Sequence, residues 1–427
     1  MIEPRQTVAL DKAHAWHPFT QHQIWNAPEH EPLVLVSGEG ALLRDSAGRE
    51  YIDGNSSIWT NLHGHRHPKI DAALRAQLDR VAHTSFLGFT HAPSAQLATE
   101  LIAFWPAQTL SRVFFSDNGS TAIEVALKMA AQFFQQTGQP QRTRFVAFSG
   151  AYHGDTMGAS SLGGIAAFHG KFAAWQFPAT HVASMAELQA LDASDVAAVV
   201  IEPLIQGAAG MRLWPTGMLA ELRLWCDAHG VLLILDEVMT GFGRTGTMFA
   251  CEREGVIPDF IALAKGLTGG YLPLAATLTT ECVFSAFLGG PERTLYYGHS
   301  YTANQLGCAA ALASLAIFRE ERVLENLRGK IVRLTQLLDG LRASPHVGEI
   351  RQCGFIAGID VQRAPGEPFP AECLTGAKVC LAARKHGLLT RPIRDTVVLM
   401  PPYCITDAQL DQAVHAIAWA IDKVCGQ

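Results

Sequence analysis

Two short apolar segments that each end on a charged residue most constrain the fold of this chain. Residues 231–235 are all aliphatic and lead into Asp236 and Glu237, and residues 260–264 lead into Lys265. Such runs, without polar alternation, are typical of strands buried on both faces of a parallel sheet. A charge at the end of an interior strand needs a compensating partner. Because ligands bind at the carboxyl ends of parallel strands, these residues mark a candidate site.

Helical and strand patterns alternate over much of the chain. Helical periodicity predicts helices over 70–81, 94–104 and 121–136. Apolar runs predict strands at 112–115, 144–148, 197–201, 231–235, 259–264 and 274–278. This rhythm predicts an α/β fold with a mostly parallel sheet between helices.

The two ends of the chain differ from this alternating middle part. We expect residues 1–64 to contribute to a small domain and to the site, 65–308 to form the large ligand-binding domain, and 309–427 to form a smaller α+β domain.

Composition narrows the classes of partner. The 427-residue chain is 48% hydrophobic and has a net charge of -6 without a basic run, which argues against nucleic acid as a partner. Its nine cysteines are scattered and form no C-x-x-C pair, as is typical of reduced thiols. Neither an apolar leader nor a run of membrane-spanning length is apparent, so we expect a cytoplasmic protein without a membrane partner.

Asp236 and Lys265 suggest a particular chemistry. They lie 29 residues apart (265 − 236), which is enough for one crossover between neighbouring parallel strands. A lysine can form a Schiff base with a carbonyl, and an aspartate can hold a pyridinium nitrogen protonated; pyridoxal phosphate needs both. A buried Asp–Lys salt bridge would explain the same spacing, and the spacing leaves both interpretations open.

A candidate phosphate site precedes the predicted helix 121–136. Gly119 would let the backbone approach an anion, and the free N–H groups near Ser120 at a helix start would bind it. Thr121 and Glu124 fit a capping box at that start. A capped helix without a ligand is the alternative.

Two further strand ends carry functional side chains. Tyr152 follows the strand 144–148 and could stack on a cofactor ring, with His153 and Asp155 nearby for polar contacts. A rim aromatic that packs on its own loop is the alternative. Glu202 follows the strand 197–201 and is a third charged strand end. The alternative is that it positions loops through hydrogen bonds.

Arg391 is a candidate carboxylate clamp, because the planar guanidinium fork matches a carboxylate bidentately. A surface salt bridge is the alternative, and Arg394 competes for the same role.

The glycines Gly241, Gly243 and Gly246 match the dinucleotide pattern G-x-G-x-x-G and follow a strand. The residues between strand and glycines, and the poor helical character of residues 247–258, argue against dinucleotide binding.

His63, His65 and His67 alternate along the chain and could suggest a metal site. No acidic or cysteine ligand lies close by in the sequence, so we expect no metal.

Together these motifs resemble the class III pyridoxal-phosphate aminotransferases. The segments that carry the resemblance are WHPFTQ, DNGS, YHGDT, IEPLIQGAAGM, LDEVMTGFGRTG, AKGLTGG, GHSYTANQLGCAAA, RPI and LMPPY. Within the class, WHPFTQ, GMRLWP and VLMPPY are most similar to the branch that aminates 8-amino-7-oxononanoate in biotin synthesis. The resemblance implies a fold type I transferase that binds pyridoxal 5'-phosphate, follows a ping-pong mechanism and forms a homodimer with shared active sites.

The resemblance also implies roles for the candidate residues. Lys265 would carry the cofactor and then act as the base that shuttles the proton. Asp236 would pair with the pyridine nitrogen, and Tyr152 would stack near the ring and the substrate. Gly119 and Ser120 would hold the phosphate.

Other implied contacts involve the partner subunit and the substrate. Gly298, His299 and Ser300 would reach the phosphate in the partner subunit's site. Arg391 would bind the carboxylate of the oxo acid.

The chain departs from the family pattern at the substrate-binding positions. Phe19 stands where a tyrosine is usual, and Ile58 and Trp59 stand where paired tryptophans are usual. The amino donor therefore stays open between S-adenosylmethionine and lysine. Two alternatives are another ω-amino acid or diamine:oxo-acid aminotransferase, and a catalytically inactive homologue that only binds.

Overall fold

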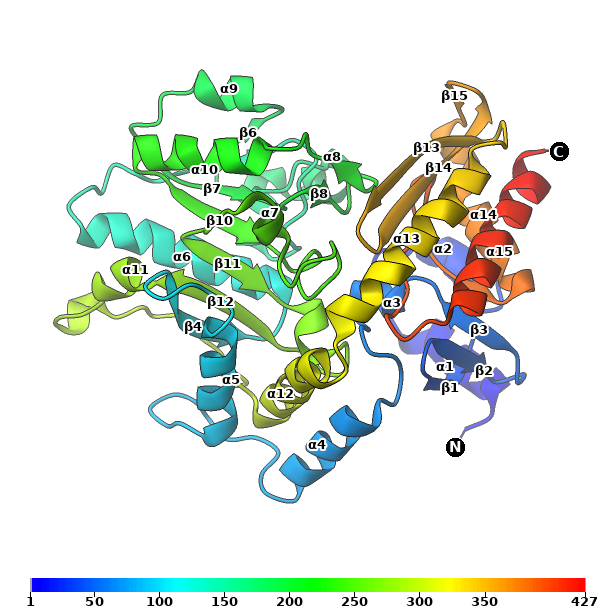
Figure 1. Cartoon of the computed structure of the whole chain (residues 1–427), viewed down its shortest axis with the longest axis horizontal. Coiled ribbons are helices and arrows are strands. Elements are labelled where there is room, and N and C mark those ends of the chain that lie inside the picture. Colours follow the sequence, from blue (N-terminus) through cyan, green and yellow to red (C-terminus); the bar gives the residue numbers. More distant parts are fainter. Residues whose placement is uncertain (1, 427) are drawn as a thin grey trace.

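Seven strands form the central sheet of this computed structural model, which describes residues 2–426 (Figure 1). Their order is β4-β12-β11-β10-β7-β5-β6. Their bounds are β4 Leu110–Ser116, β5 Arg144–Phe148, β6 Ala179–Val182, β7 Val196–Ile201, β10 Leu232–Asp236, β11 Phe260–Leu263 and β12 Ala275–Thr280. Strand β12 is antiparallel to β11 and β4, whereas the pairs among the other strands are parallel. The predicted, mostly parallel α/β sheet is confirmed.

Both faces of this sheet are buried, as the apolar runs predict. Leu233 and Leu235 pack in one core with α5, α10 and α12, whereas Leu232 and Ile234 pack in a second core with α6. Successive strand residues point to opposite faces, so a strand covered on both sides must be apolar at every position. The covering helices are α5 Ala92–Ile102, α6 Gly119–Gln136, α10 Met218–His229 and α12 Gln305–Glu320.

Two smaller sheets lie apart from the central sheet, on the right in Figure 1. One contains β1 Leu35–Glu39, β2 Leu42–Asp45, β3 Glu50–Asp53 and β16 Leu388–Leu389; the other contains β13 Val347–Cys353, β14 Ile356–Ala364, β15 Glu367–Pro368, β17 Pro392–Ile393 and β18 Thr396–Leu399. Because β16 pairs with β3, the first strands join the C-terminal part of the chain. This agrees with the division at 64 and 308, which stays a prediction.

The remaining helices connect and cover these sheets. They are α1 Pro4–His14, α2 His22–Trp25, α3 Ser56–Trp59, α4 Pro68–Leu78, α7 Met157–Ser161, α8 Ala166–His169, α9 Met185–Gln189, α11 Glu281–Ser285, α13 Val323–Leu341, α14 Thr375–Ala383 and α15 Asp407–Cys425. Among residues 2–426, none of the helices has the length and apolar character needed to cross a membrane.

Helix α6 begins two residues earlier than the sequence suggests. Asn118 is its N-cap: the side-chain oxygen accepts from the Thr121 backbone N–H at 3.0 Å, and the Thr121 hydroxyl oxygen accepts from the Asn118 N–H at 3.2 Å. The capping box predicted for Thr121 and Glu124 is therefore wrong. The Glu124 carboxylate instead accepts from the Thr156 hydroxyl.

The glycine-rich segment after β10 is a turn. Gly243 and Gly246 have φ values of 92° and 98°, which favour glycine, and the next regular element is the short 3-10 helix Ala250–Glu254. The intervening Arg244 is buried and donates to the backbone carbonyls of Asn61 and Pro401. The segment connects the two halves of the molecule and does not open a dinucleotide-binding helix.

The rings of His63 and His67 are neighbours, with centres 5.9 Å apart, but the three alternating histidines have different polar partners. His63 lies 2.9 Å from the Ser314 hydroxyl, whereas His65 and His67 lie beside two different carboxylates. In the described part of the chain, no three potential metal-ligating side chains gather.

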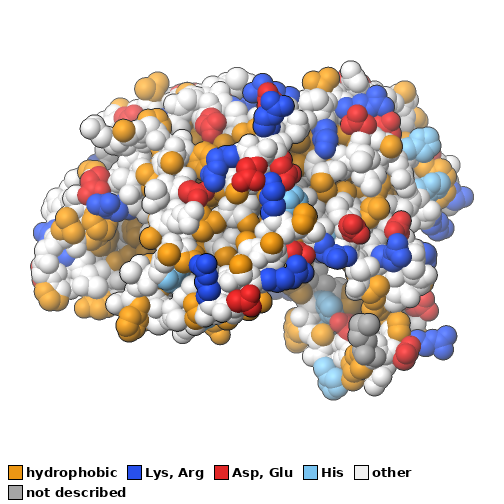
Figure 2. Space-filling view, turned by 60° about the horizontal axis from the view of Figure 1, so that its bottom comes forward, with side chains coloured by type: hydrophobic (Ala, Val, Ile, Leu, Met, Phe, Trp, Pro, Cys, Tyr) orange, Lys and Arg blue, Asp and Glu red, His pale blue; other side chains and the backbone are white. Residues whose placement is uncertain are grey.

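Lys and Arg side chains alternate with Asp and Glu side chains across the face shown in Figure 2. Side chains of both charges therefore lie close together on this face.

Candidate active site

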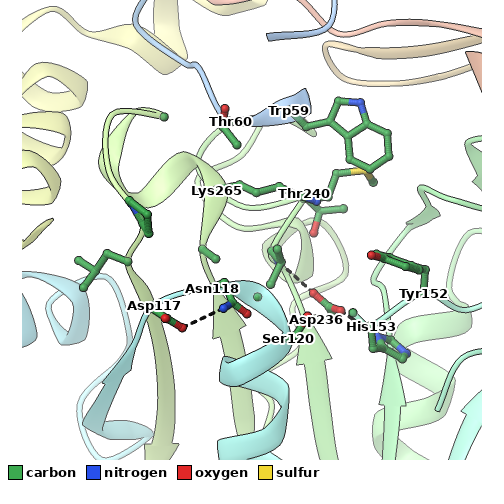
Figure 3. A pocket seen from close by; sticks show the side chains of 18 of the residues that line it. Trp59, Thr60, Asp117, Asn118, Ser120, Tyr152, His153, Asp236, Thr240 and Lys265 are labelled. Atoms are coloured by element: carbon green, nitrogen blue, oxygen red, sulfur yellow. Dashed lines mark hydrogen bonds and ion pairs between the residues drawn. The ribbon is translucent and has the colours of Figure 1, made fainter. Parts of the chain in front are cut away.

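A cavity of about 470 Å³ lies at the carboxyl ends of the central strands (Figure 3). This volume suits a small organic molecule. Most of the residues predicted for cofactor binding line it, namely Gly119, Ser120, Tyr152, Asp236 and Lys265.

The two strand ends that predicted the site are neighbours. Strands β10 and β11 are parallel, with Asp236 opposite Ala262, so Asp236 and Lys265 reach one cavity. Lys265 begins the 3-10 helix Lys265–Thr268 with a φ of 40°. This left-handed backbone is unfavourable for a residue with a Cβ atom, and such strain concentrates at functional sites.

The partner of Asp236 is a histidine. One Asp236 oxygen lies 2.8 Å from His153 Nδ1, and the other accepts from the Val238 backbone N–H at 3.1 Å. Asp236 and His153 are both buried. The spacing of Asp236 and Lys265 left open the interpretation that they form a buried salt bridge with each other. That interpretation is therefore wrong.

Lys265 faces an aromatic ring. Its Nζ lies 4.7 Å from the centre of the Trp59 ring, and no hydrogen bond or ion pair to Nζ forms within residues 2–426. Burial lowers the pKa of Lys265, while the charges of Asp236 and Glu202 oppose that shift. A lowered pKa increases the fraction of neutral amine, which is the form that attacks a carbonyl or accepts a proton.

Glu202 organises the loop that carries Tyr152. Its two buried carboxylate oxygens accept from the backbone N–H groups of Tyr152 at 3.1 Å and Gly207 at 2.9 Å. Burial raises the pKa of Glu202 to about 7. These two hydrogen bonds bear out the alternative role of Glu202 in positioning loops.

The start of α6 forms one wall of the cavity. Its first N–H groups have no partner within the helix, as at any helix start, and they suit an anion. A Cβ atom on Gly119 would lie 2.7 Å from the Val238 side chain, so this position needs glycine. The Ser120 hydroxyl accepts from the Asp155 backbone N–H at 3.1 Å.

Tyr152 lines the cavity beside the Phe168 ring. Its hydroxyl donates to Asp155 Oδ2 at 2.6 Å. Burial, and then this carboxylate, raise the pKa of Tyr152. Phe168 packs edge-on against Tyr152 at 6.0 Å between ring centres and against Phe19 at 5.6 Å. Phe19 therefore lies at the margin of the site, although it is 63% exposed.

The α3 residues Ile58 and Trp59 occupy different places. Both have a φ of 68°, but Trp59 lines the cavity whereas Ile58 is 43% exposed.

The predicted loop 298–300 lies outside the wall of this cavity. His299 Nε2 is 3.9 Å from Asp117 Oδ1, and the Ser300 carbonyl oxygen lies 2.8 Å from His83 Nε2. Gly298 has a φ of 154°. Of the residues in these contacts, Asp117 alone lines the cavity.

Arg391 is also outside the cavity wall and is exposed. It directly precedes β17, and its charge, together with the larger effect of burial, lowers the pKa of Arg384. Its neighbour Arg394 lines a second cavity, which shares Ala208 with the first.

Sequence patterns did not reveal several parts of the wall. Thr240 and Met239 line the cavity from the turn after β10, and residues 271–274 line it from the segment after Lys265. Thr240 follows Asp236 by four residues, but only the path of the turn brings it back to the site. The contact of Trp59 with Lys265 joins positions far apart in the sequence and gives no local signal.

A covered α/β sheet with a lysine and an aspartate at neighbouring strand ends is the arrangement that the sequence predicts for a class III aminotransferase. Residues 25–421 match the protein family described as Aminotransferase class-III, and the chain belongs to this family.

Its similarity to individual aminotransferases extends over nearly the full chain. It is 50% identical to the adenosylmethionine-8-amino-7-oxononanoate aminotransferase of Nitratidesulfovibrio vulgaris, over 97% of this chain and 81% of that protein. It is 46% identical to the enzyme of that name from Geobacter sulfurreducens, over 97% of both chains.

Solved structures have the same fold. The structure of the adenosylmethionine-8-amino-7-oxononanoate aminotransferase of Methanocaldococcus jannaschii superimposes with a TM-score of 0.95 at 39% identity, covering 99% of this chain and 100% of that one. An (S)-enantioselective omega-transaminase from Thermomicrobium roseum superimposes with a TM-score of 0.94 at 32% identity, covering 99% of each chain.

Proposed function

We propose that this protein converts 8-amino-7-oxononanoate to 7,8-diaminononanoate in biotin synthesis, by a ping-pong mechanism that uses pyridoxal 5'-phosphate. The amino donor is S-adenosylmethionine or lysine. The observation that carries the proposal is that Asp236 and Lys265 enter one cavity without pairing to each other. The names of the relatives from N. vulgaris, G. sulfurreducens and M. jannaschii support the choice of substrate.

The side chains around the cavity fit pyridoxal phosphate. Among the described residues, the buried atoms Thr240 Oγ1 and His153 Nε2 in the cavity wall have no hydrogen-bond partner. Burying a polar atom without a hydrogen-bond partner costs free energy unless a ligand or water provides that partner. The start of α6 suits a phosphate, and the Lys265 amine is available for a covalent link. When bound, the cofactor supplies an electron-withdrawing ring that stabilises negative charge on the substrate carbon.

Each residue near the cofactor has a distinct task in this proposal. Lys265 holds the cofactor, and its lowered pKa suits it to take up and return a proton at Nζ. Asp236, oriented by His153, holds a proton on the ring nitrogen. Gly119 and Ser120 hold the phosphate, and Tyr152 borders the ring and the substrate.

The substrate and the partner subunit complete the site. Arg391 binds the substrate carboxylate, while Phe19, Ile58 and Trp59 border the substrate chain. In a homodimer, Gly298, His299 and Ser300 reach the phosphate of the neighbouring site. The nine cysteines are free, in keeping with work in the reducing cytoplasm.

The proposed function is tested by separate half-reactions. The cofactor-loaded protein is mixed with S-adenosylmethionine or with lysine, and transfer of the amino group is followed by absorbance. We expect one donor to cause a full spectral change that 8-amino-7-oxononanoate then reverses. A protein that responds to neither donor would contradict the assignment.

A second candidate function is a broader ω-amino acid or diamine transaminase. The similarity to the T. roseum structure and the residues Phe19 and Ile58 favour it. A simple oxo acid that reverses the spectral change faster than 8-amino-7-oxononanoate would select this candidate.

A further inference from the structure

A buried histidine behind Tyr152 has no part in the function proposed so far. His169, the last residue of α8, is 4% exposed. Its ring lies parallel to the Tyr152 ring, with centres 5.9 Å and planes 16° apart. Its Nε2 lies 3.8 Å from Asp155 Oδ1, and the other oxygen of that carboxylate accepts the Tyr152 hydroxyl at 2.6 Å. We propose that His169 is a positioning residue that holds the Asp155 carboxylate and, through it, the Tyr152 hydroxyl.

The surroundings of His169 are unusual for a purely structural ring. Both ring nitrogens are buried, and neither has a hydrogen-bond partner within residues 2–426. Leaving polar atoms unpaired is costly, so an apolar ring would fill this place at lower cost. The ring is also confined, because a Cβ atom on Gly163 would lie 1.9 Å from His169 Nδ1. A small closing movement of Asp155 would give the Nε2 side of His169 the partner that it lacks.

The Asp155 carboxylate needs other groups to hold its orientation. Its backbone N–H is anchored on the Ser120 hydroxyl at 3.1 Å, but its side chain is 52% exposed. An exposed carboxylate rotates toward water unless other groups hold it. Tyr152 and His169 contact different oxygens of this carboxylate, so together they fix its rotation.

The orientation of the Tyr152 hydroxyl determines what the cavity can bind. Figure 3 shows this side chain directed toward the cavity. Because the hydroxyl donates its only hydrogen to Asp155, its oxygen can only accept a hydrogen bond from a ligand. This suits the N–H groups of an amino substrate. The inference rests on the proposed function, and it assigns His169 to substrate binding and not to proton transfer at Lys265.

Two variants separate the polar role of His169 from its stacking role. His169→Phe keeps a ring but loses the nitrogens, whereas His169→Gln can place an amide donor near the Nε2 position. We expect His169→Phe to raise the KM for 8-amino-7-oxononanoate about tenfold, with kcat nearly unchanged, because the hydrogen bond from the Tyr152 hydroxyl to the charged Asp155 carboxylate would no longer be held. We expect His169→Gln to stay within about threefold of the wild-type KM.

Crystal structures of both cofactor-loaded variants give a readout that does not depend on activity. The Tyr152–Asp155 bond should stay near 2.6 Å in His169→Gln and be lost in His169→Phe. An unchanged KM with an intact bond in His169→Phe, or a large KM increase in His169→Gln, would overturn the inference. Wild-type protein that does not aminate this acceptor would refute the proposed function instead, and the two structures would still decide the role of His169.

Discussion

The inner and outer parts of the candidate site are built differently. The inner part is set by β10, β11 and the segment after β5: Asp236 and His153 are 5% and 2% exposed and contact each other directly. The outer part is set by loops, and Phe19 and Ile58 there are 63% and 43% exposed. A sheet covered on both faces allows little variation at its strand ends, whereas exposed loops tolerate change. We infer that the inner part determines the reaction and the outer part determines the substrate.

The sharpest test of this comparison between the inner and outer parts is removal of the Lys265 amine. We expect Lys265→Ala to lower turnover by at least about a thousandfold, because both the covalent link and the base are lost. Stability should not fall, since burial lowers the pKa of Lys265 and the variant buries no charge. Turnover is measured by product formation, and folding by circular dichroism. Turnover near the wild-type rate would mean that another residue is the base.

The next largest effect should come from the inner carboxylate. Asp236→Asn cannot hold a proton on the ring nitrogen by charge, and we expect turnover to fall by at least about a hundredfold. It also replaces the charged acceptor beside His153 with a neutral one, which should cost about 1–3 kcal/mol of stability. Turnover and denaturant unfolding measure the two effects. A stable variant with wild-type turnover would remove Asp236 from the proposed mechanism.

A smaller, selective effect is expected at the outer part. Loss of a carboxylate clamp in Arg391→Ala should raise the KM for the oxo acid about tenfold or more and change kcat less. Arg394→Ala is the matched control, because Arg394 is an exposed arginine only three residues away. Steady-state kinetics compare the two. If Arg394→Ala raises the KM and Arg391→Ala does not, the clamp is Arg394.

The smallest effect concerns stability against pH. Because burial raises the pKa of Glu202 from 4.5 to about 7, the folded protein binds more protons than the unfolded chain between these values. Stability should therefore fall as pH rises through this window, by on the order of 3 kcal/mol from this group. Glu202→Gln should flatten the dependence, measured as the free energy of unfolding.

Glu237→Gln is the matched control for that variant. Burial raises the pKa of Glu237 to about 7 as well, but Glu237 does not line the cavity. Both variants should flatten the pH dependence of stability, and only Glu202→Gln should alter substrate kinetics. An unchanged pH dependence in both would contradict the buried, proton-binding state of these carboxylates.

Sequence reasoning could predict the inner part because its signals are local. An aliphatic run that ends on a charge identifies both the strand and the site, as at Asp236 and Lys265. Strand β6 gives no such signal, since its four residues have no apolar run. The pairing of Asp236 with His153 joins two strand ends, which only the strand order could reveal.

The outer part could not be predicted in the same way. The contact of Trp59 with Lys265 depends on the left-handed backbone of α3, for which the local sequence offers no signal. His169 lies in a short helix, and its proximity to Asp155 depends on how α8 packs against the Tyr152 loop.

The central claim is that the inner part holds pyridoxal phosphate on Lys265. Borohydride reduction of the cofactor-loaded protein, followed by proteolysis and mass spectrometry, tests it most directly. We predict a single modified peptide that contains Lys265, and none in Lys265→Ala. A reduced cofactor attached to a different lysine, or no attached cofactor in the wild-type protein, would contradict the account.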